Sequence, residues 1–137
     1  MTQILIEGYT SDEVFHFPLP ELEALIFTGE PIELKIGSAK ILAQFQKTEC
    51  TLTLELAQID GGGEGVLLTL ALLVEKYAQL TSLTEIHWIV HAVHCAKPNL
   101  KLRRMLIRKG FQLKELDGVG LVYFRNQMLY QFVVSSP

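Results

Sequence analysis

Residues 58–65 read QIDGGGEG, which sets four glycines among acidic neighbours. A glycine-rich turn between a strand and a helix can aim backbone N–H groups and the positive helix end at a phosphate. The same glycines also suit a plain turn, because glycine adopts positive φ without strain. Asp60 and Glu64 could cap the start of the helix, but their negative charges would repel a pyrophosphate. The segment is therefore either an anion site or a structural turn.

A second candidate is the basic stretch KPNLKLRRMLIRKGF at 97–111, which holds six of the twelve Lys and Arg residues. On a helix, four basic residues would form one stripe, with apolar residues on the opposite side. The stripe comprises Lys97, Lys101, Arg104 and Arg108, and the apolar side comprises Leu102, Met105 and Leu106. The stretch is interpreted as an amphipathic helix whose cationic face is either only solvated or also binds an anion.

Histidines cluster in EIHWIVHAVHC, residues 85–95. On a helix, their spacing would suit zinc ligands, but the β-branched content favours a strand. His87 and His91 would then stand roughly 13 Å apart on one face, with His94 on the other, so no metal site is expected. His91 or Glu55 is a candidate general base, and a hydrogen-bonded structural histidine is the alternative.

Several function classes have no support in the sequence. It contains no GxSxG elbow, no GxxxxGK[ST] phosphate loop and no CxxC pair. Hydrolase, nucleoside-triphosphatase and zinc-ribbon chemistry are therefore not indicated. The net charge of -3 argues against attraction to nucleic acid or to an anionic membrane.

Length and composition predict one globular domain over residues 1–137. With 49% apolar and 20% charged residues, the chain can bury roughly two-thirds of its unfolded surface. The longest uncharged apolar run, 65–74, is far shorter than the roughly 18–20 residues that span a bilayer. The N-terminus lacks the basic region of a secretory signal, and the two cysteines suggest reduced thiols, so we expect a cytoplasmic protein.

The first half of the chain must position the glycine turn. Gln3–Glu7 and Val14–Phe17 read as two strands joined by the turn TSD, which predicts an opening hairpin. ELEALIFTG predicts a helix of at most two turns that ends at Gly29. An antiparallel meander is predicted next, with strands Ile32–Ile36, Ala39–Lys47 and Thr51–Ile59.

The second half begins with an apolar helix, 66–80, which we expect to be buried on most sides. Asn99 and Gly110 have the residue types that cap a helix over 100–109. Four strands are predicted, with turns at 117–118 and 125–126: Glu85–Cys95, Phe111–Leu116, Leu121–Phe124 and Met128–Val134. The order predicts an α/β (α+β) fold with helices against a mainly antiparallel sheet, in which the crossover helix makes strands 51–59 and 85–95 parallel neighbours.

This order resembles that of the GNAT superfamily of acyl-CoA-dependent N-acetyltransferases over about residues 32–134. The family has a Q/R-x-x-G-x-G/A turn after its fourth strand, which binds the CoA pyrophosphate through backbone N–H groups. The stretch from Gln58 to Gly63 fits that pattern, and Gly65 could serve in another register. The family also often has an Asn near the pantetheine arm and a helix ending in GF twelve residues later, which Asn99, Gly110 and Phe111 reproduce.

The resemblance implies acetyl-CoA or another acyl-CoA as cosubstrate, transfer of an acetyl group to an amine, and no metal. It implies cofactor contacts at Gln58, Ile59, Gly61, Gly62, Gly63, Gly65, Asn99 and Arg104, with Glu55 or His91 as the base. Leu106 stands where many members have a Tyr that protonates the departing thiolate, and a leucine cannot donate a proton. Tyr123 is a candidate substitute.

A second hypothesis is a non-catalytic GNAT-like module that binds or assembles. The leucine, the acids in the turn and a divergent segment 1–31, with room for one short helix where the family has two, all favour it. The β-forming stretch LYQFVV near the C-terminus would offer a strand edge for a homodimer contact.

Overall fold

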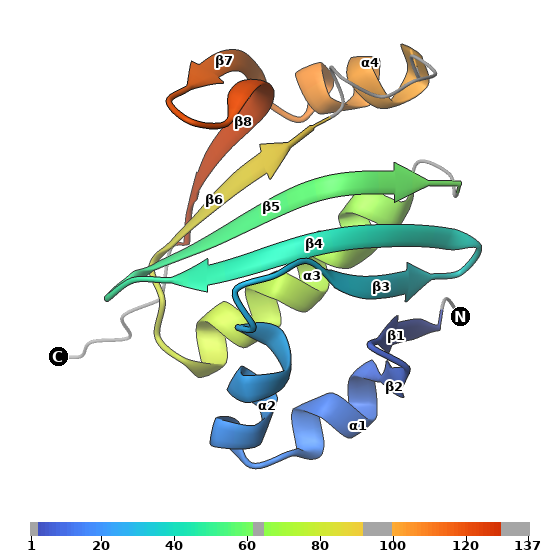
Figure 1. Ribbon diagram of the computed structural model, residues 1–137, viewed down its shortest axis with the longest axis vertical. Helices are drawn as coiled ribbons and strands as arrows, with labels where there is room; N and C mark the ends of the chain where they lie inside the picture. The colour runs from blue at the N-terminus through green and yellow to red at the C-terminus, as the bar shows by residue number, and fades with distance from the viewer. Residues whose placement is uncertain (1–2, 62–64, 92–99, 130–137) are drawn as a thin grey trace, which may run out of the picture.

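The computed structural model describes residues 3–61, 65–91 and 100–129, and for residues 100–102 the backbone alone. These residues form an eight-stranded sheet in the order β2-β1-β3-β4-β5-β6-β8-β7 (Figure 1). Only the β5–β6 pair is parallel among the strand pairs of the described chain. The strands are β1 Ile4–Ile6, β2 Tyr9–Thr10, β3 Ile32–Ile36, β4 Ala39–Lys47, β5 Thr51–Asp60, β6 Glu85–Val90, β7 Gln112–Leu116 and β8 Gly120–Met128. The helices are α1 Ser11–His16, α2 Leu19–Ile26, α3 Gly65–Leu80 and α4 Leu100–Arg108. The predicted mixed, mainly antiparallel sheet with helices is confirmed.

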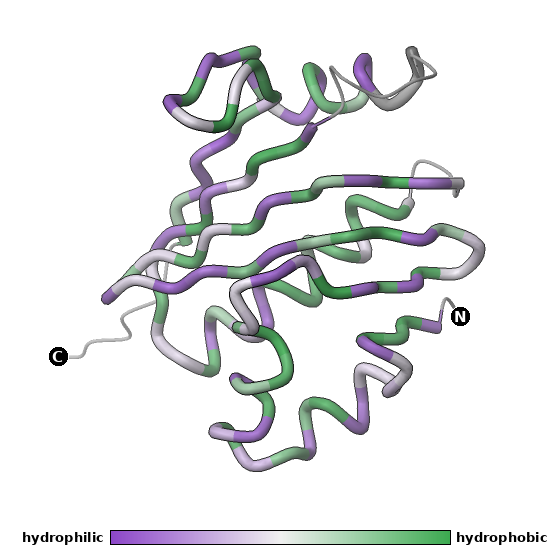
Figure 2. The backbone as a smooth tube through the Cα atoms, in the orientation of Figure 1, coloured by the Kyte–Doolittle hydropathy of each residue, from purple (hydrophilic) through white to green (hydrophobic). Residues whose placement is uncertain are grey.

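The meander β3–β4–β5 forms because apolar residues alternate along each strand. Leu52, Leu54 and Leu56 are at most 1% exposed and share one face of β5, while Glu55 points to the other face. The alternation is visible as a change of hydropathy from residue to residue along these strands (Figure 2). The predicted bounds of β3 and β4 are confirmed, and β5 extends one residue further.

The predicted opening hairpin is wrong in its second strand. Residues 14–17 do not pair with β1, because Ser11–His16 is helix α1 and the short strand β2 takes the place beside β1. The Thr10 hydroxyl accepts the Glu13 N–H, and the Glu13 carboxylate accepts the Thr10 N–H, which is a capping box. The chain therefore has two short helices, α1 and α2, before β3, where only one was expected.

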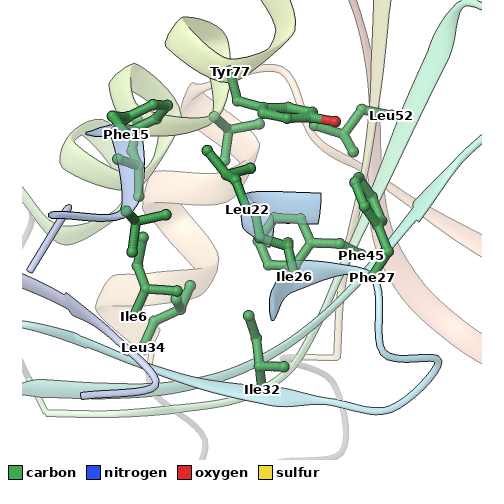
Figure 3. Close-up of a pocket in the computed structure, with 13 residues that line it drawn as sticks. Ile6, Phe15, Leu22, Ile26, Phe27, Ile32, Leu34, Phe45, Leu52 and Tyr77 are labelled. Atoms are coloured by element: carbon green, nitrogen blue, oxygen red, sulfur yellow. The ribbon is translucent and has the colours of Figure 1, made fainter. Parts of the chain in front are cut away.

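The two N-terminal helices complete the core on one face of the sheet. Leu22 and Ile26 of α2 point toward Leu34 of β3 and Tyr77 of α3 (Figure 3). The space left between these side chains is an apolar cavity of about 30 Å³. That volume is close to a single water's share of the liquid, so this contact is a packed core and not a ligand pocket.

The crossover helix α3 buries one side only. Leu70 and Ala78 are fully buried, whereas Leu68 and Leu72 are 55% and 60% exposed. The expectation that the helix is buried on most sides is therefore wrong, since its outer stripe stays exposed although it is apolar. No helix of the described chain is long and apolar enough to cross a bilayer.

The C-terminal part differs from the prediction at β8. This strand runs without interruption through the predicted turn, because Arg125 and Asn126 pair with Trp88 and His87 of β6. β6 ends at Val90, and residues 92–99 and 130–137, which include most of the predicted last strand, lie outside the described residues. The turn at Asp117 and Gly118 is confirmed between β7 and β8.

Candidate functional site

The parallel strands β5 and β6 separate at a defined point. Their pairing ends at Leu56 and Val90, where the His91 N–H also donates to the Leu56 carbonyl at 3.0 Å. β5 then continues to Asp60 paired with β4 alone, and Ala57 is an extra residue in its register against β4. The two strands diverge beyond this point (Figure 1).

Glu55 and His91 meet where the strands separate. The carboxylate Oε2 of Glu55 lies 2.6 Å from His91 Nε2, and the side chains are 31% and 20% exposed. A carboxylate that accepts the Nε2–H fixes the orientation of the ring and stabilises its protonated form. Because Glu55 projects away from the leucines of β5, the pair lies on the face opposite to the helices. This arrangement can perform general base chemistry.

The other described histidine of the 85–95 cluster has a different partner. His87 bonds to the Glu85 carboxylate, and its ring meets Phe124 edge-on at 5.6 Å between centroids. His87 and His91 therefore do not converge, and within the described residues no three His, Cys, Asp or Glu side chains are grouped to hold a metal ion. His94 and Cys95 lie outside the described residues.

The start of the glycine turn is shaped by backbone geometry. Gly61 has a φ of 75°, and a Cβ there would lie 3.2 Å from the Ser38 carbonyl oxygen in the β3–β4 turn. The sequence therefore needs glycine at 61 for structural reasons alone. A Cβ on Gly65, the first residue of α3, would meet nothing within 4 Å, so the fold does not require glycine there. Gly62 and Gly63 are outside the described part of the chain.

The acids around the turn do not both act as caps. The Gln58 side-chain amide donates to the Asp60 carboxylate, so these two residues, two apart on β5, bind each other. Ile59 is partly buried and packs against the core. The first turn of α3, from Gly65 onward, carries no acidic residue. Glu64 is not among the described residues.

The remaining predicted site residues lie on or near α4 and β8. Arg104 is exposed on α4, whereas Leu106 is fully buried. Tyr123 of β8 is 4% exposed and pairs with Val90, directly before His91. Asn99 lies outside the described residues.

Sequence reasoning named Glu55 and His91 as separate candidates and missed that they bind each other. Part of this could be read from the sequence. If the parallel strands that begin at Thr51 and Glu85 pair from their first residues, His91 follows directly after the partner of Leu56. The spacing of residues in the sequence does not show which carboxylate would bind the His91 ring. That depends on the side-chain geometry at the point where β5 and β6 separate.

No protein-family model matches the sequence, and no curated protein matches it. Several solved structures are similar to the chain, among them three acetyltransferases. An acetyltransferase of the GNAT family from Streptococcus pneumoniae has 14% identity and a TM-score of 0.43, over 80% of this chain and 74% of that chain. The PaiA N-acetyltransferase from Thermoplasma acidophilum, in complex with coenzyme A, has 11% identity and a TM-score of 0.47, over 90% and 99%.

An acetyltransferase of the GNAT family from Listeria monocytogenes has 17% identity and a TM-score of 0.41, over 86% of this chain and 76% of that chain. All three are acetyltransferases. The chain itself has the predicted order of β5, α3, β6 and α4, with two helices before β3. At these identities and TM-scores, the likeness says nothing about side chains or chemistry.

Proposed function

We propose that the chain binds acetyl-CoA or another acyl-CoA and transfers the acetyl group to an amine. The observation that carries the proposal is the Glu55–His91 bond at the point where β5 and β6 separate, close in the chain to a glycine turn that opens α3. A base and an anion-binding helix end are the two parts that direct transfer from a thioester needs.

The backbone around the turn would hold the pyrophosphate. Gly61 and Gly65 flank it, and the glycine at 65 is not needed by the fold, which fits a position kept free for close approach of a ligand. The proposed cosubstrate contacts are Gln58, Ile59, Gly61, Gly62, Gly63, Gly65, Asn99 and Arg104. The Asp60 carboxylate is engaged by Gln58, which lessens its repulsion of a phosphate.

In the transfer step, the amine nitrogen attacks the thioester carbonyl carbon and the carbon–sulfur bond breaks. The Glu55–His91 pair accepts the proton of the amine, and the Glu55 carboxylate stabilises the imidazolium that forms. The CoA thiolate leaves and takes a proton from water.

Acetyl-CoA binding is tested by a thermal-shift or calorimetric titration. A ligand at a hundred times its Kd stabilises a fold by about 2.7 kcal/mol. Gly65→Ala is expected to leave stability unchanged or slightly raised, because its Cβ meets nothing, and to weaken binding at least about tenfold. Gly118→Ala, in the β7–β8 turn, is the glycine control: its φ of 77° strains alanine, so this variant should lose some stability but bind acetyl-CoA normally. No stabilisation at millimolar acetyl-CoA would refute the proposal.

Transfer is measured as release of the CoA thiol with a panel of primary amines. His91→Gln should lower the rate by about 10²–10⁴-fold without changing acetyl-CoA affinity. His87→Gln, on the same strand but bonded to Glu85, is the control and should keep the rate. Equal losses in the two variants would remove His91 from the chemistry.

A non-catalytic GNAT-like module is the second candidate. The observation that favours it is Leu106, fully buried at the position where the family resemblance expects a proton donor. Saturable acetyl-CoA binding with no thiol release toward any amine would support this candidate over the enzyme.

A further inference from the structure

A second cavity, of about 230 Å³, lies between α3 and α4 over β6 and β8. Its apolar walls include Leu67 and Ala71 of α3, Met105 of α4, and Trp88 of β6. It opens to solvent beside Leu68, which is 55% exposed. Unlike the 30 Å³ cavity in the core, it has room for a small molecule.

This cavity is separate from the Glu55–His91 pair. Trp88 pairs with Leu54 and with Arg125, and Leu54 and Trp88 are both buried on the helix-covered face. Glu55 follows Leu54 and therefore projects from the opposite face. The sheet itself lies between the two sites.

The side chains that line the cavity carry a net charge of +1, from Lys109 and Arg125 against Glu75. Four polar residues line it: Glu75, Lys109, Arg125 and Gln127. The Trp88 indole N–H donates to Gln127 Oε1 at 2.9 Å, and the Gln127 amide donates to Glu75 Oε2 at 3.0 Å, so these groups have partners. Lys109 and Arg125 form no ion pair with any acid in the described part of the chain.

Arg125 reaches the end of α4. A Cβ on Gly110, the residue after Lys109, would lie 3.9 Å from Arg125 Nε. A guanidinium with free N–H groups prefers a carboxylate, which it can bind through two parallel hydrogen bonds. An anionic group is therefore expected at this end.

The rest of the cavity suits a ring. Trp88 and Phe111 both line it and stand edge to face, with centroids 6.5 Å apart and planes at 72°. A dry apolar cavity of about 150 Å³ holds benzene. The volume here is larger and therefore accommodates one ring together with a carboxylate.

We propose that the cavity between α3 and α4 is a binding site for a small ring-bearing carboxylate, with the ring against Trp88 and the carboxylate on Arg125 and Lys109. The site is distinct from the proposed acyl-CoA site and does not depend on it. Its ligand class is set by the pairing of an aromatic wall with two unpaired cations.

Trp88 is the single tryptophan of the chain, so its fluorescence reports binding directly. The probes are benzoate and cyclohexanecarboxylate, with excitation at the red edge of tryptophan absorption. Both are expected to change the emission saturably and to raise the melting temperature. Benzyl alcohol, which keeps the ring without the charge, and acetate, which keeps the charge without the ring, should each bind about tenfold more weakly or worse.

Three variants locate the ligand. Arg125→Met and Ala71→Leu should weaken benzoate binding about tenfold or more, the first by removing the cation and the second by filling the cavity. Arg108→Met removes an exposed charge of α4 that does not line the cavity, and should bind like the parent chain. Lys109→Met provides a second test if the Arg125 variant fails to fold.

Three outcomes would overturn the proposal. One is the absence of any saturable signal from either carboxylate at millimolar concentration. Another is equal weakening by Arg108→Met and Arg125→Met. The third is displacement of benzoate by acetyl-CoA, which would make the cavity part of the acyl-CoA site. Retention of benzoate binding in Gly65→Ala, whatever that variant does with acetyl-CoA, supports two separate sites.

Discussion

Glu23 connects three elements through one carboxylate. Lys47 at the end of β4 and the Tyr77 hydroxyl of α3 both donate to Glu23 Oε2 of α2, the latter at 2.7 Å. The bond from Lys47, and then that from Tyr77, holds the pKa of the Glu23 carboxyl below its usual value. Burial and the neighbouring carboxylate raise the pKa of Tyr77, which therefore remains a hydroxyl donor. This network fastens α2 to the sheet and to α3.

The lowered pKa predicts how stability depends on pH. A depressed folded-state pKa contributes stability above the ordinary value of 4.5, and the contribution is lost as pH falls through the lowered value. Glu23→Gln should therefore lower the free energy of unfolding by roughly 0.5–1 kcal/mol at neutral pH, with the difference shrinking as the pH falls below 4.5. Urea unfolding at several pH values measures it.

The control for that measurement is Glu115→Gln, an exposed acid on β7 that forms no ion pair within the described residues. It should change stability little at any pH. A Glu23→Gln difference that stays constant from neutral to acidic pH would show that the effect is not the titration of this carboxylate.

The candidate site shows what the sequence could and could not predict for single residues. Residue type singled out Glu55 and His91, because a carboxylate and an imidazole can each act as a general base. The engagement of Asp60 by Gln58 was not predictable, since a carboxylate beside a helix start has a competing role as a cap. Arg125 was assigned to a turn, so its place in a cavity could not be foreseen.

Among the elements, strand prediction succeeded where a sheet face is buried. β3 and β4 alternate buried and exposed residues, and their bounds follow from that period. β8 was split in two because Arg125 and Asn126 resemble a turn, yet pairing with β6 on one side and β7 on the other keeps the strand continuous. Tertiary pairing outweighed the local preference for a turn.

Helix α1 was not predicted, because a local capping interaction outweighed the strand-like composition of its residues. VFHF has the composition of a strand, but the segment T-x-x-E before it satisfies two free N–H groups at a helix start. We expect Thr10→Ala to lower the free energy of unfolding by about 1 kcal/mol, because the Glu13 N–H loses its acceptor. Chemical denaturation measures the difference.

Thr10→Ser is the matched variant, since it keeps the hydroxyl that accepts from Glu13. It should retain most of the stability of the parent chain. If serine costs as much as alanine, the methyl group of Thr10 and not the capping bond is responsible.

At the scale of the whole molecule, the N-terminal helices share one core with the sheet. Val14 and Leu22 are at most 3% exposed and belong to the same buried cluster as Val74, Tyr77 and Trp88. A chain built this way has no separate N-terminal unit with its own core. Residues far from each other in sequence should therefore gain and lose their structure together.

That expectation is tested with Leu22→Ala in α2. Removing a buried leucine should lower the free energy of unfolding by about 2–5 kcal/mol. Because unfolding is shared, the fluorescence of Trp88 in β6 should report the same loss as far-UV circular dichroism, with coincident transitions. Leu19→Ala, in the same helix at a residue 47% exposed, should cost far less. A Trp88 transition that does not move while the circular dichroism signal shifts would mean that α1 and α2 unfold independently of the sheet.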